Sequence, residues 1–369
     1  MIVTLRKGNH SAFDDLVRYP PAGVNYDIPG SVTVRKNDLV TYVKKRVFVN
    51  YLKLTRSPQS VYVPQKRGSQ LIHACSGIIP LNASPWVIDM EHVNSFVGFE
   101  AGRRLDQVKG KVERYLASDY CRKILPWSEA AKRSVLNGLD TRAFAHKIEV
   151  VYPAMAPLKN FRKKKHDVPT MLYIGNNFYE KGAREVVNAF LRVRKSMDAR
   201  LRIVSWAPRE FVEKYGDVVE FCEPIMPRSR IINEFYATAD LFVLPSYHDT
   251  FGMVYEEAMA TATPVVATDV FAIPEILGDA GSYVRAPVSY YNDKNLFKWD
   301  SWKSFGEYVR NHRFPKFEDK LVKTMTALLE SPSARKKMAR EGLRRVRNGP
   351  VSIKARNARL RRIYEEAAS

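Results

Sequence analysis

ADLFVLPSYHDTFGMVYEEAMATATPVVATDVFAIPE, residues Ala239 to Glu275, contains the strongest structural signal in the chain. Its apolar run from Leu241 to Leu244 is too short for a buried helix and is bounded by turn-forming residues, which predicts a buried strand of a parallel sheet. Good helix formers follow from Val254 to Ala260, and a second apolar strand follows from Pro264 to Ala267. The pattern predicts one strand–loop–helix–strand unit of an α/β protein.

Two carboxylates flank the loop from Tyr247 to Gly252. Ligands of open α/β sheets bind at the carboxyl ends of strands, where this loop is expected to lie. Asp249 precedes the helix and Glu257 lies about one turn inside it, so both side chains can face one crevice. The alternative is a surface loop in which the aspartate caps the helix and the glutamate is solvated.

The backbone of the same loop is suited to an anion. Gly252 has no side chain, so a ligand can come close to the main chain there. The amides of Phe251, Met253 and Val254 belong to the start of the helix, where free N–H groups and the helix dipole favour negative charge. Carboxylates for hydroxyls and amides for phosphates together indicate a nucleotide-sugar site.

The stretch resembles the donor-site signature of glycosyltransferase family 4, the retaining group 1 glycosyl transferases of the GT-B fold. That signature usually reads P-S-x-x-E-x-F-G-x-x-x-x-E-A-M-A, and the matching residues are Pro245, Ser246, Asp249, Phe251, Gly252, Glu257, Ala258, Met259 and Ala260. Asp249 stands where the family usually has glutamate, and Thr263 stands where a glycine usually precedes the proline. The resemblance implies that Glu257 binds ribose hydroxyls and Asp249 binds hydroxyls of the donor sugar.

The second half of the chain begins with another unit of this kind. Met171 to Ile174 is a predicted strand, and a helix is expected from Lys181 to Arg194. Lys181 and Gly182 match the Lys-Gly pair of the family, which implies that Lys181 reaches the donor diphosphate. The family often has an arginine where Asn176 stands, after Gly175, and Arg228 is expected to supply the missing contact. The predicted donor-binding residues are Gly175, Asn176, Lys181, Arg228, Phe251, Gly252, Met253, Val254 and Glu257.

Polar residues also end a strand in the first half. Trp86 to Ile88 is a predicted buried strand, followed by Asp89, Glu91 and His92. The resemblance implies that His92 lies close to the donor sugar, which adds it to Lys181, Asp249 and Glu257 as a catalytic residue. Two alternatives stay open: a metal site made by Asp89, Glu91 and His92, or a structural role in which His92 is hydrogen-bonded away from substrate.

The chain has room for two domains. We expect an acceptor-binding Rossmann-like domain at residues 1–155, whose last strand is Ile148 to Tyr152. Residues 156–350 form the predicted donor-binding Rossmann-like domain, which begins with a proline- and lysine-rich linker. The resemblance implies that the two doubly wound domains face a cleft and that residues 351–369 form a helix that packs back on the first domain.

Composition limits the partners. The net charge is +21, which suits nucleic acid, an anionic membrane or a polyanionic substrate, and the basic clusters lie at Lys44–Arg46, Arg162–Lys165 and Arg335–Arg347. The chain shows neither a nucleic-acid-binding motif nor a spanning apolar run. Its beginning lacks the apolar core of a signal peptide. The three cysteines lack zinc spacing and favour a reducing compartment, so we expect a cytoplasmic protein that docks at the inner face of the membrane, with a purely soluble enzyme as the alternative.

These observations predict a hexosyltransferase-type glycosyltransferase. It would move a sugar from a nucleoside-diphosphate sugar to a hydroxyl of a glycan or lipid-linked acceptor, with retention implied by the family resemblance. The absence of an Asp-x-Asp pair and the presence of Lys181 predict transfer without a metal or other cofactor. A dehydrogenase is excluded because no G-x-G-x-x-G follows a strand. The remaining alternative is a non-catalytic α/β protein that binds nucleic acid or nucleotide.

Overall fold

The computed structural model describes residues 1–369 except 9, 30–51, 53, 99–104, 157 and 159. Its contacts divide the chain into two compact units, and each unit is described by itself. Unit 1 comprises Met1–Pro153, Lys294–Leu296 and Arg356–Ser369, and unit 2 comprises Ala154–Asp293 and Phe297–Ala355. The basic cluster Lys44–Arg46 lies outside the described residues.

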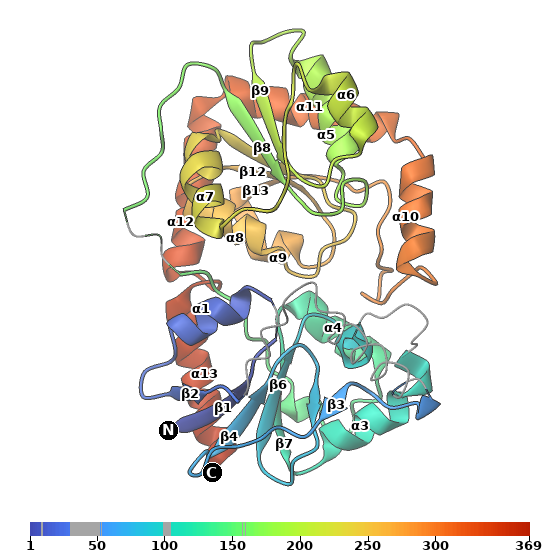
Figure 1. Ribbon diagram of the computed structural model, residues 1–369, viewed down its shortest axis with the longest axis vertical. Coiled ribbons are helices and arrows are strands. Elements are labelled where there is room, and N and C mark those ends of the chain that lie inside the picture. Colours follow the sequence, from blue (N-terminus) through green and yellow to red (C-terminus); the bar gives the residue numbers. More distant parts are fainter. Residues whose placement is uncertain (9, 30–51, 53, 99–104, 157, 159) are drawn as a thin grey trace. The chain divides into compact units, whose positions relative to one another are not determined.

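Unit 1 is built on a five-stranded parallel sheet in the order β2-β1-β4-β6-β7 (Figure 1). Its strands are β1 (Ile2–Arg6), β2 (Asn25–Asp27), β4 (Leu71–Ala74), β6 (Trp86–Met90) and β7 (Cys121–Pro126). Numbered along the chain, this order is 2-1-3-4-5, so the direction of winding reverses between β1 and β4. Ligands of doubly wound sheets bind at such a switch point.

Shorter elements complete unit 1. A separate pair of strands is formed by β3 (Ser60–Val61) and β5 (Ile79–Pro80). The helices and helical turns are α1 (Ala12–Arg18), η1 (Val93–Val97), η2 (Leu105–Gln107), α3 (Lys109–Ala117), α4 (Glu129–Gly138), η3 (Ala145–Lys147) and most of α13 (Ile353–Ala368). The core between the sheet and α3 is apolar and fully buried, with Trp86, Ile88 and Leu116 at its centre.

Unit 2 is built on a six-stranded parallel sheet in the order β10-β9-β8-β11-β12-β13. Its strands are β8 (Thr170–Ile174), β9 (Arg200–Val204), β10 (Glu220–Cys222), β11 (Leu241–Leu244), β12 (Val265–Thr268) and β13 (Gly281–Val284). Numbered along this unit the order is 3-2-1-4-5-6, the strand order of a Rossmann fold. The predicted strand at Leu241–Leu244 is confirmed with the same bounds, and its switch-point neighbour is β8.

Helices lie on both faces of the unit 2 sheet, with α5 beside α11 and α8 beside α12 (Figure 1). They are α5 (Ala183–Val193), α6 (Arg209–Tyr215), α7 (Arg228–Arg230), α8 (Met253–Ala260), α9 (Ile273–Leu277), α10 (Trp302–Asn311), α11 (Pro315–Glu330) and α12 (Pro332–Asn348), with turns η4 (Ile231–Phe235), η5 (Tyr236–Thr238) and η6 (Gly278–Ala280). Within the described part of the chain, no helix has both the length and the apolar character needed to cross a membrane.

Two predicted element bounds in unit 1 were wrong. Strand β6 runs through Met90, so Asp89 lies inside the strand and not after it. The predicted strand Ile148–Tyr152 is only an isolated bridge between Ile148 and Ile124, although two backbone hydrogen bonds continue the pairing. Its register with β7 ends where proline at 153 removes a donor.

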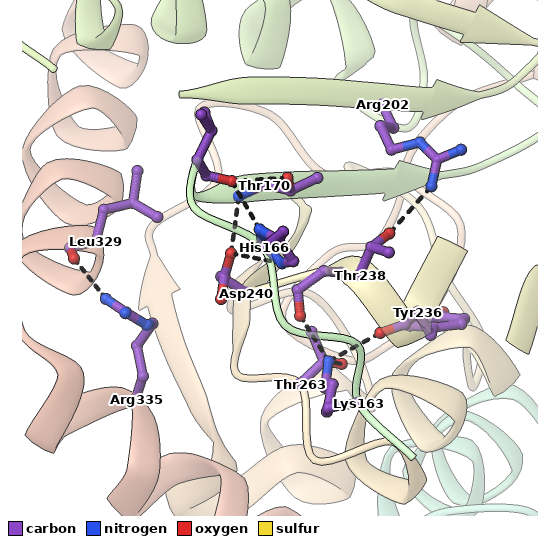
Figure 2. Close-up of polar contacts among 12 residues, drawn as sticks. Lys163, His166, Thr170, Arg202, Tyr236, Thr238, Asp240, Thr263, Leu329 and Arg335 are labelled. Atoms are coloured by element: carbon purple, nitrogen blue, oxygen red, sulfur yellow. Dashed lines mark hydrogen bonds and ion pairs between the residues drawn. The ribbon is translucent and has the colours of Figure 1, made fainter. Parts of the chain in front are cut away.

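The linker that opens unit 2 is anchored by the ammonium group of Lys163, whose contacts Figure 2 shows. The Lys163 ammonium donates to the carbonyl oxygen of Tyr236 at 2.8 Å and to Oγ1 of Thr263 at 2.6 Å. Burial lowers the pKa of Lys163 to about 8. His166 and the amide of Thr170 both contact the Asp240 carboxylate. Thr263, which replaces the usual glycine of the family signature, thus provides an acceptor for the linker.

The C-terminal helix contributes polar groups to unit 1. The Tyr364 hydroxyl lies 2.6 Å from Nδ1 of His73 and 2.9 Å from the hydroxyl of Tyr26. The guanidinium of Arg356 donates to the carbonyl oxygen of Tyr19 at 2.7 Å. These contacts hold α13 against the sheet and α1 of this unit.

Candidate functional site

The candidate donor site of unit 2 is built from the two loops at the switch point of its sheet. One loop follows β8 and leads to Lys181, and the other follows β11 and contains Asp249. Because β8 and β11 are adjacent parallel strands, their carboxyl ends lie side by side. The loops therefore meet although 68 residues separate Lys181 from Asp249.

Lys181 joins the two loops. Its ammonium lies 2.8 Å from Oδ2 of Asp249 and donates to the carbonyl oxygen of His248 at 2.6 Å. The next residue, Gly182, has φ +77° and caps α5, and a Cβ there would lie 2.6 Å from the carbonyl oxygen of Pro245. Glycine is required at 182 because any side chain would push the loops apart. In the Lys-Gly pair, the lysine therefore supplies the charge and the glycine allows the two loops to pack.

Gly252 shapes the start of α8. It has φ +78°, and a Cβ there would lie 2.5 Å from the Tyr255 ring and 3.3 Å from Cγ of Asp249. Phe251 and Met253, on either side of Gly252, are both buried. The first amides of α8, including that of Val254, thus lie at a helix N-terminus close to the Asp249 carboxylate, as the spacing predicts.

Glu257 is paired with Arg228. Its Oε1 accepts a hydrogen bond from Nε of Arg228 at 2.6 Å, and the glutamate side chain is only 9% exposed, against 33% for the arginine. A carboxylate can accept more than one hydrogen bond. The sequence predicted Arg228 as a ligand of the diphosphate, and the structure adds that it orients Glu257.

The two remaining predicted donor-site residues lie in the loop after β8. Gly175 is half-buried, and a Cβ there would lie 2.8 Å from the Tyr173 hydroxyl and 3.3 Å from Cβ of Lys181. Asn176 is exposed. The unit 2 residues predicted from sequence are thus carried by the loops after β8 and β11, by α8 and by α7.

An aromatic segment packs on the donor loop, and the sequence pattern did not assign this segment to any element. The His248 ring stacks on Tyr291 with centroids 5.4 Å apart and meets Trp302 edge-on at 4.7 Å. The amide of Tyr290 donates to the carbonyl oxygen of Tyr247 at 3.1 Å. The signals that could have located α10 were the Ser301 cap, which accepts from the Ser304 amide, and the density of aromatic residues after β13.

A buried ion pair fixes the end of α10 beside α5. Arg184 and Glu185 are both fully buried and lie 2.6 Å apart. Burial raises the pKa of Glu185, while the adjacent guanidinium opposes that rise. Arg184 also donates to the carbonyl oxygens of Val309, Arg310 and His312. The cost of burying the Arg184 charge is therefore offset by several charge-assisted hydrogen bonds. Arg184 follows Lys181 by three residues in the sequence.

His92 belongs to unit 1 and is completely buried there. Its Nδ1 accepts from the amide of Asn94 at 3.1 Å, which caps η1, and its Nε2 lies 2.7 Å from the carbonyl oxygen of Asn295. Burial lowers the pKa of His92 to about 4, so the imidazole is neutral near pH 7. A role of His92 at the donor sugar stays a prediction.

The structure does not group Asp89, Glu91 and His92 as a metal site. Within the part of the chain that the structure describes, the one cluster of potential metal ligands is His73, Cys75 and Asp89. Asp89 Oδ2 lies 3.1 Å from Nε2 of His73, because alternate residues of β6 point to opposite faces and adjacent strands bring the two side chains together. His73 and Cys75 were missed as ligands, although they lie two positions apart at the end of β4.

Sequence comparison bears on unit 2 above all. Residues 168–292 match the family model described as Glycosyl transferases group 1. That segment contains Lys181, Arg228, Asp249 and Glu257. A curated relative, an uncharacterized glycosyltransferase of Methanocaldococcus jannaschii, is 25% identical over 229 residues. The match covers 54% of this chain and 56% of the relative, so the chain spans little more than half of that protein.

Solved structures show the same fold over nearly the whole chain. HepE of Anabaena, solved with UDP and glucose, is similar with a TM-score of 0.61 at 13% identity, over 99% of each chain. Sucrose-phosphate synthase of Thermosynechococcus elongatus is similar with a TM-score of 0.59 at 18% identity, over 94% of this chain and 84% of that one. These neighbours have the GT-B fold, which agrees with two Rossmann-like units.

Proposed function

We propose that this protein is a glycosyltransferase that moves a hexosyl group from a nucleoside-diphosphate sugar to an acceptor hydroxyl, with retention at the anomeric carbon. The observation that supports it is the contact of Lys181 with Asp249 at the switch point of the unit 2 sheet. A cation, a carboxylate and a helix N-terminus meet at the place where a doubly wound sheet binds nucleotides.

Each part of this site has a place in donor binding. Glu257, oriented by Arg228, accepts hydrogen bonds from the ribose hydroxyls. Asp249 accepts hydrogen bonds from hydroxyls of the sugar, and its carboxylate is held in place by the 2.8 Å contact with Lys181. The Lys181 ammonium and the first amides of α8 face the diphosphate. UDP and glucose bound to the similar Anabaena protein support this class of ligand.

The chemical step breaks the bond between the anomeric carbon and the diphosphate oxygen. The bonding electron pair leaves with the diphosphate, a new bond forms to the acceptor oxygen, and the proton of that oxygen passes to the leaving diphosphate oxygen. Lys181, Arg228 and the α8 amides offset the charge that builds on the leaving group, and preorganised charge of this kind often contributes more to catalysis than any other single effect. These residues supply that charge without a metal at the donor phosphates.

The test is a panel of UDP-, GDP- and ADP-sugars, each measured by calorimetry with and without EDTA. One nucleotide is expected to bind preferentially, with an affinity that the chelator leaves unchanged. NMR of the product from the preferred donor should show the anomeric configuration of the donor. Failure of all three nucleotide classes to bind would overturn the proposal and favour a non-catalytic α/β protein that binds another ligand.

The proposed acceptor is a lipid-linked glycan reached from an anionic membrane surface. The support is the charge of +21 together with one face of α12, where Lys336, Lys337, Arg340 and Arg347 are exposed at helical spacing. Basic residues near an anionic surface contribute about 1 kcal/mol each to binding. On α13, in contrast, Arg361 and Arg362 are paired with glutamates, so α12 is the stronger candidate.

A further inference from the structure

The end of β4 in unit 1 gathers three different metal-binding side chains. His73 lies in β4, Cys75 follows that strand directly, and Asp89 lies in the neighbouring strand β6. One ligand atom from each of the three lies within 4.8 Å of the other two, and all three residues are at least 95% buried. We propose that His73, Cys75 and Asp89 bind one Zn²⁺ ion.

The position of the cluster in the sheet supports a ligand site. The order β2-β1-β4-β6-β7 reverses between β1 and β4, and the cluster lies at the carboxyl end of β4, beside that reversal. Such a switch point is where doubly wound sheets bind their ligands. The amide of Cys75 donates to the carbonyl oxygen of Arg6 at 3.2 Å, which ties the cysteine to the end of β1.

The donor set selects the metal. A thiolate, an imidazole and a carboxylate together suit Zn²⁺, whereas Mg²⁺ and Ca²⁺ take oxygen ligands. Zinc bonds of about 2.0–2.3 Å place tetrahedral ligand atoms about 3.3–3.8 Å apart. Nε2 of His73 and Oδ2 of Asp89 are 3.1 Å apart, so they need to separate only slightly to hold the ion. The thiolate and the carboxylate also neutralise the charge of Zn²⁺ once the thiol has lost its proton.

The surrounding hydrogen bonds already orient these ligands. Nδ1 of His73 lies 2.6 Å from the Tyr364 hydroxyl, so the tautomer with its N–H on Nδ1 can donate there and offer the lone pair of Nε2 to the ion. Tyr364 in turn contacts the Tyr26 hydroxyl at 2.9 Å. The second carboxylate oxygen of Asp89, Oδ1, accepts from the amide of Ser76 at 2.9 Å. Outer-sphere contacts of this kind are typical of zinc sites.

A cavity gives access to the cluster. Both His73 and Asp89 line it together with Phe13, Trp127 and Arg356. Three protein ligands with a fourth position left for water or another ligand are typical of zinc sites that bind small molecules. The cavity that His73 and Asp89 line would supply that fourth ligand.

The test uses the full chain and measures metal binding, which is independent of transferase activity. Elemental analysis of the folded protein is expected to find one zinc per chain. After removal of zinc with a chelator, Co²⁺ should bind with one equivalent and produce the visible bands of a tetrahedral site and a thiolate-to-cobalt band in the near ultraviolet. A folded wild-type protein that binds no stoichiometric Co²⁺, or binds it without the thiolate band, overturns the proposal.

Variants assign the ligands. Cys75→Ser should abolish the thiolate band and weaken Co²⁺ binding by more than about a hundredfold, beyond the loss typical of an outer-sphere change. Tyr364→Phe should keep the band and weaken binding about 10- to 100-fold. Cys121→Ser is the matched control, because Cys121 is equally buried in the same sheet but lies outside the cluster. Loss of the band in Cys121→Ser, or its persistence in Cys75→Ser, would show that another thiol binds the metal.

Discussion

The Lys181 ammonium lies 2.8 Å from the Asp249 carboxylate, and the two residues come from loops that end adjacent strands of one parallel sheet. The lysine thereby holds the loop that contains Asp249 through both its side chain and the carbonyl oxygen of His248. A diphosphate that binds here meets a cation whose position is already fixed. The same contact joins Lys181, which is predicted to bind the phosphates, to Asp249, which is predicted to bind the sugar.

Replacement of this cation should weaken donor binding. Lys181→Met removes a charged hydrogen-bond donor, which costs about 1.5–3 kcal/mol, or about 10- to 150-fold in affinity for the nucleoside diphosphate. Calorimetry with the preferred nucleotide measures the loss. Lys195→Met removes an exposed lysine beyond the end of α5 and serves as the control. Equal affinities of Lys181→Met and the wild type would assign the diphosphate to another cation.

The carboxylate of Glu257 should be essential for transfer. Glu257→Gln keeps the shape of the side chain but removes the charge that Arg228 pairs with and that ribose hydroxyls would contact. We expect kcat/KM to fall about ten- to a hundredfold or more, since charged hydrogen bonds contribute about 1.5–3 kcal/mol. Glu234→Gln, at an exposed glutamate paired with Arg230, is the matched control. A folded Glu257→Gln protein with wild-type turnover would rule out the assignment of the donor site.

The length of the residue at 249 should set the preference among donor sugars. Asp249 is 8% exposed, and a glutamate at this position would carry its carboxylate one methylene further from the backbone in this buried setting. Asp249→Glu should change the ratio of kcat/KM values for two sugars on the same nucleotide by about 1–3 kcal/mol, or about 5- to 150-fold. The affinity for the free nucleoside diphosphate should stay within about twofold. An unchanged ratio would show that Asp249 does not contact the sugar.

The sequence predicted which unit 2 residues come together because local pattern and sheet topology agree there. An apolar run with the bounds of β11, a glycine at the start of α8 and Lys181 before a capping glycine each have a local signal. Because β8 and β11 are adjacent parallel strands, their carboxyl ends lie side by side, and the residues that follow them come together. The pairing of Arg228 with Glu257 was not predicted, because it depends on where the short helix α7 lies and no periodic pattern specifies that position.

The polar cluster of unit 1 could not be assembled in the same way. Tyr364 meets His73 across 291 residues of sequence, and only the docking of α13 decides which of its residues reaches β4. The sequence pattern also predicted that Asp89 follows its strand, whereas Asp89 lies inside β6. Asp89 was therefore grouped with Glu91 and His92 and not with His73. The segment around α10 was unassigned because its aromatic residues lack a helical period until Ser301 starts the helix.

Burial of His92 should make stability depend on pH. Its pKa of about 4 lies below its ordinary value, so between these two values the unfolded chain binds more protons and the free energy of unfolding falls as pH falls. From about pH 7 to about pH 5 the loss from this group is about 2 kcal/mol. The free energy of unfolding of His92→Gln, measured with denaturant at several pH values, should not show this loss of about 2 kcal/mol between about pH 7 and about pH 5.

The control for this dependence is His146→Gln, which replaces an exposed histidine of the same unit. Its unfolding free energy should follow the pH dependence of the wild type. Identical slopes in the wild type and His92→Gln would contradict a neutral, buried His92. A weaker pH dependence of the unfolding free energy in His146→Gln would show that His146, and not His92, causes that dependence.

The exposed basic face of α12 should bind anionic membranes. Lys336→Glu, Lys337→Glu and Arg340→Glu together reverse three exposed charges on one helix, while the buried residues of α12, Gly342 and Val346, stay unchanged. Since each basic residue contributes about 1 kcal/mol near an anionic surface, the triple variant should lose more than about a hundredfold in vesicle binding. Co-sedimentation at low salt with vesicles that contain phosphatidylserine or phosphatidylglycerol measures the effect.

The matched control changes the net charge by the same amount elsewhere in unit 2. Lys195→Glu, Lys214→Glu and Lys303→Glu alter exposed lysines that lie outside α12, so binding through this helix should survive in that variant. If both triple variants lose binding equally, the attraction comes from net charge and not from α12. Equal recovery of the wild type in the supernatant with neutral and with anionic vesicles would refute membrane docking and leave the donor site untouched, because its residues lie outside α12.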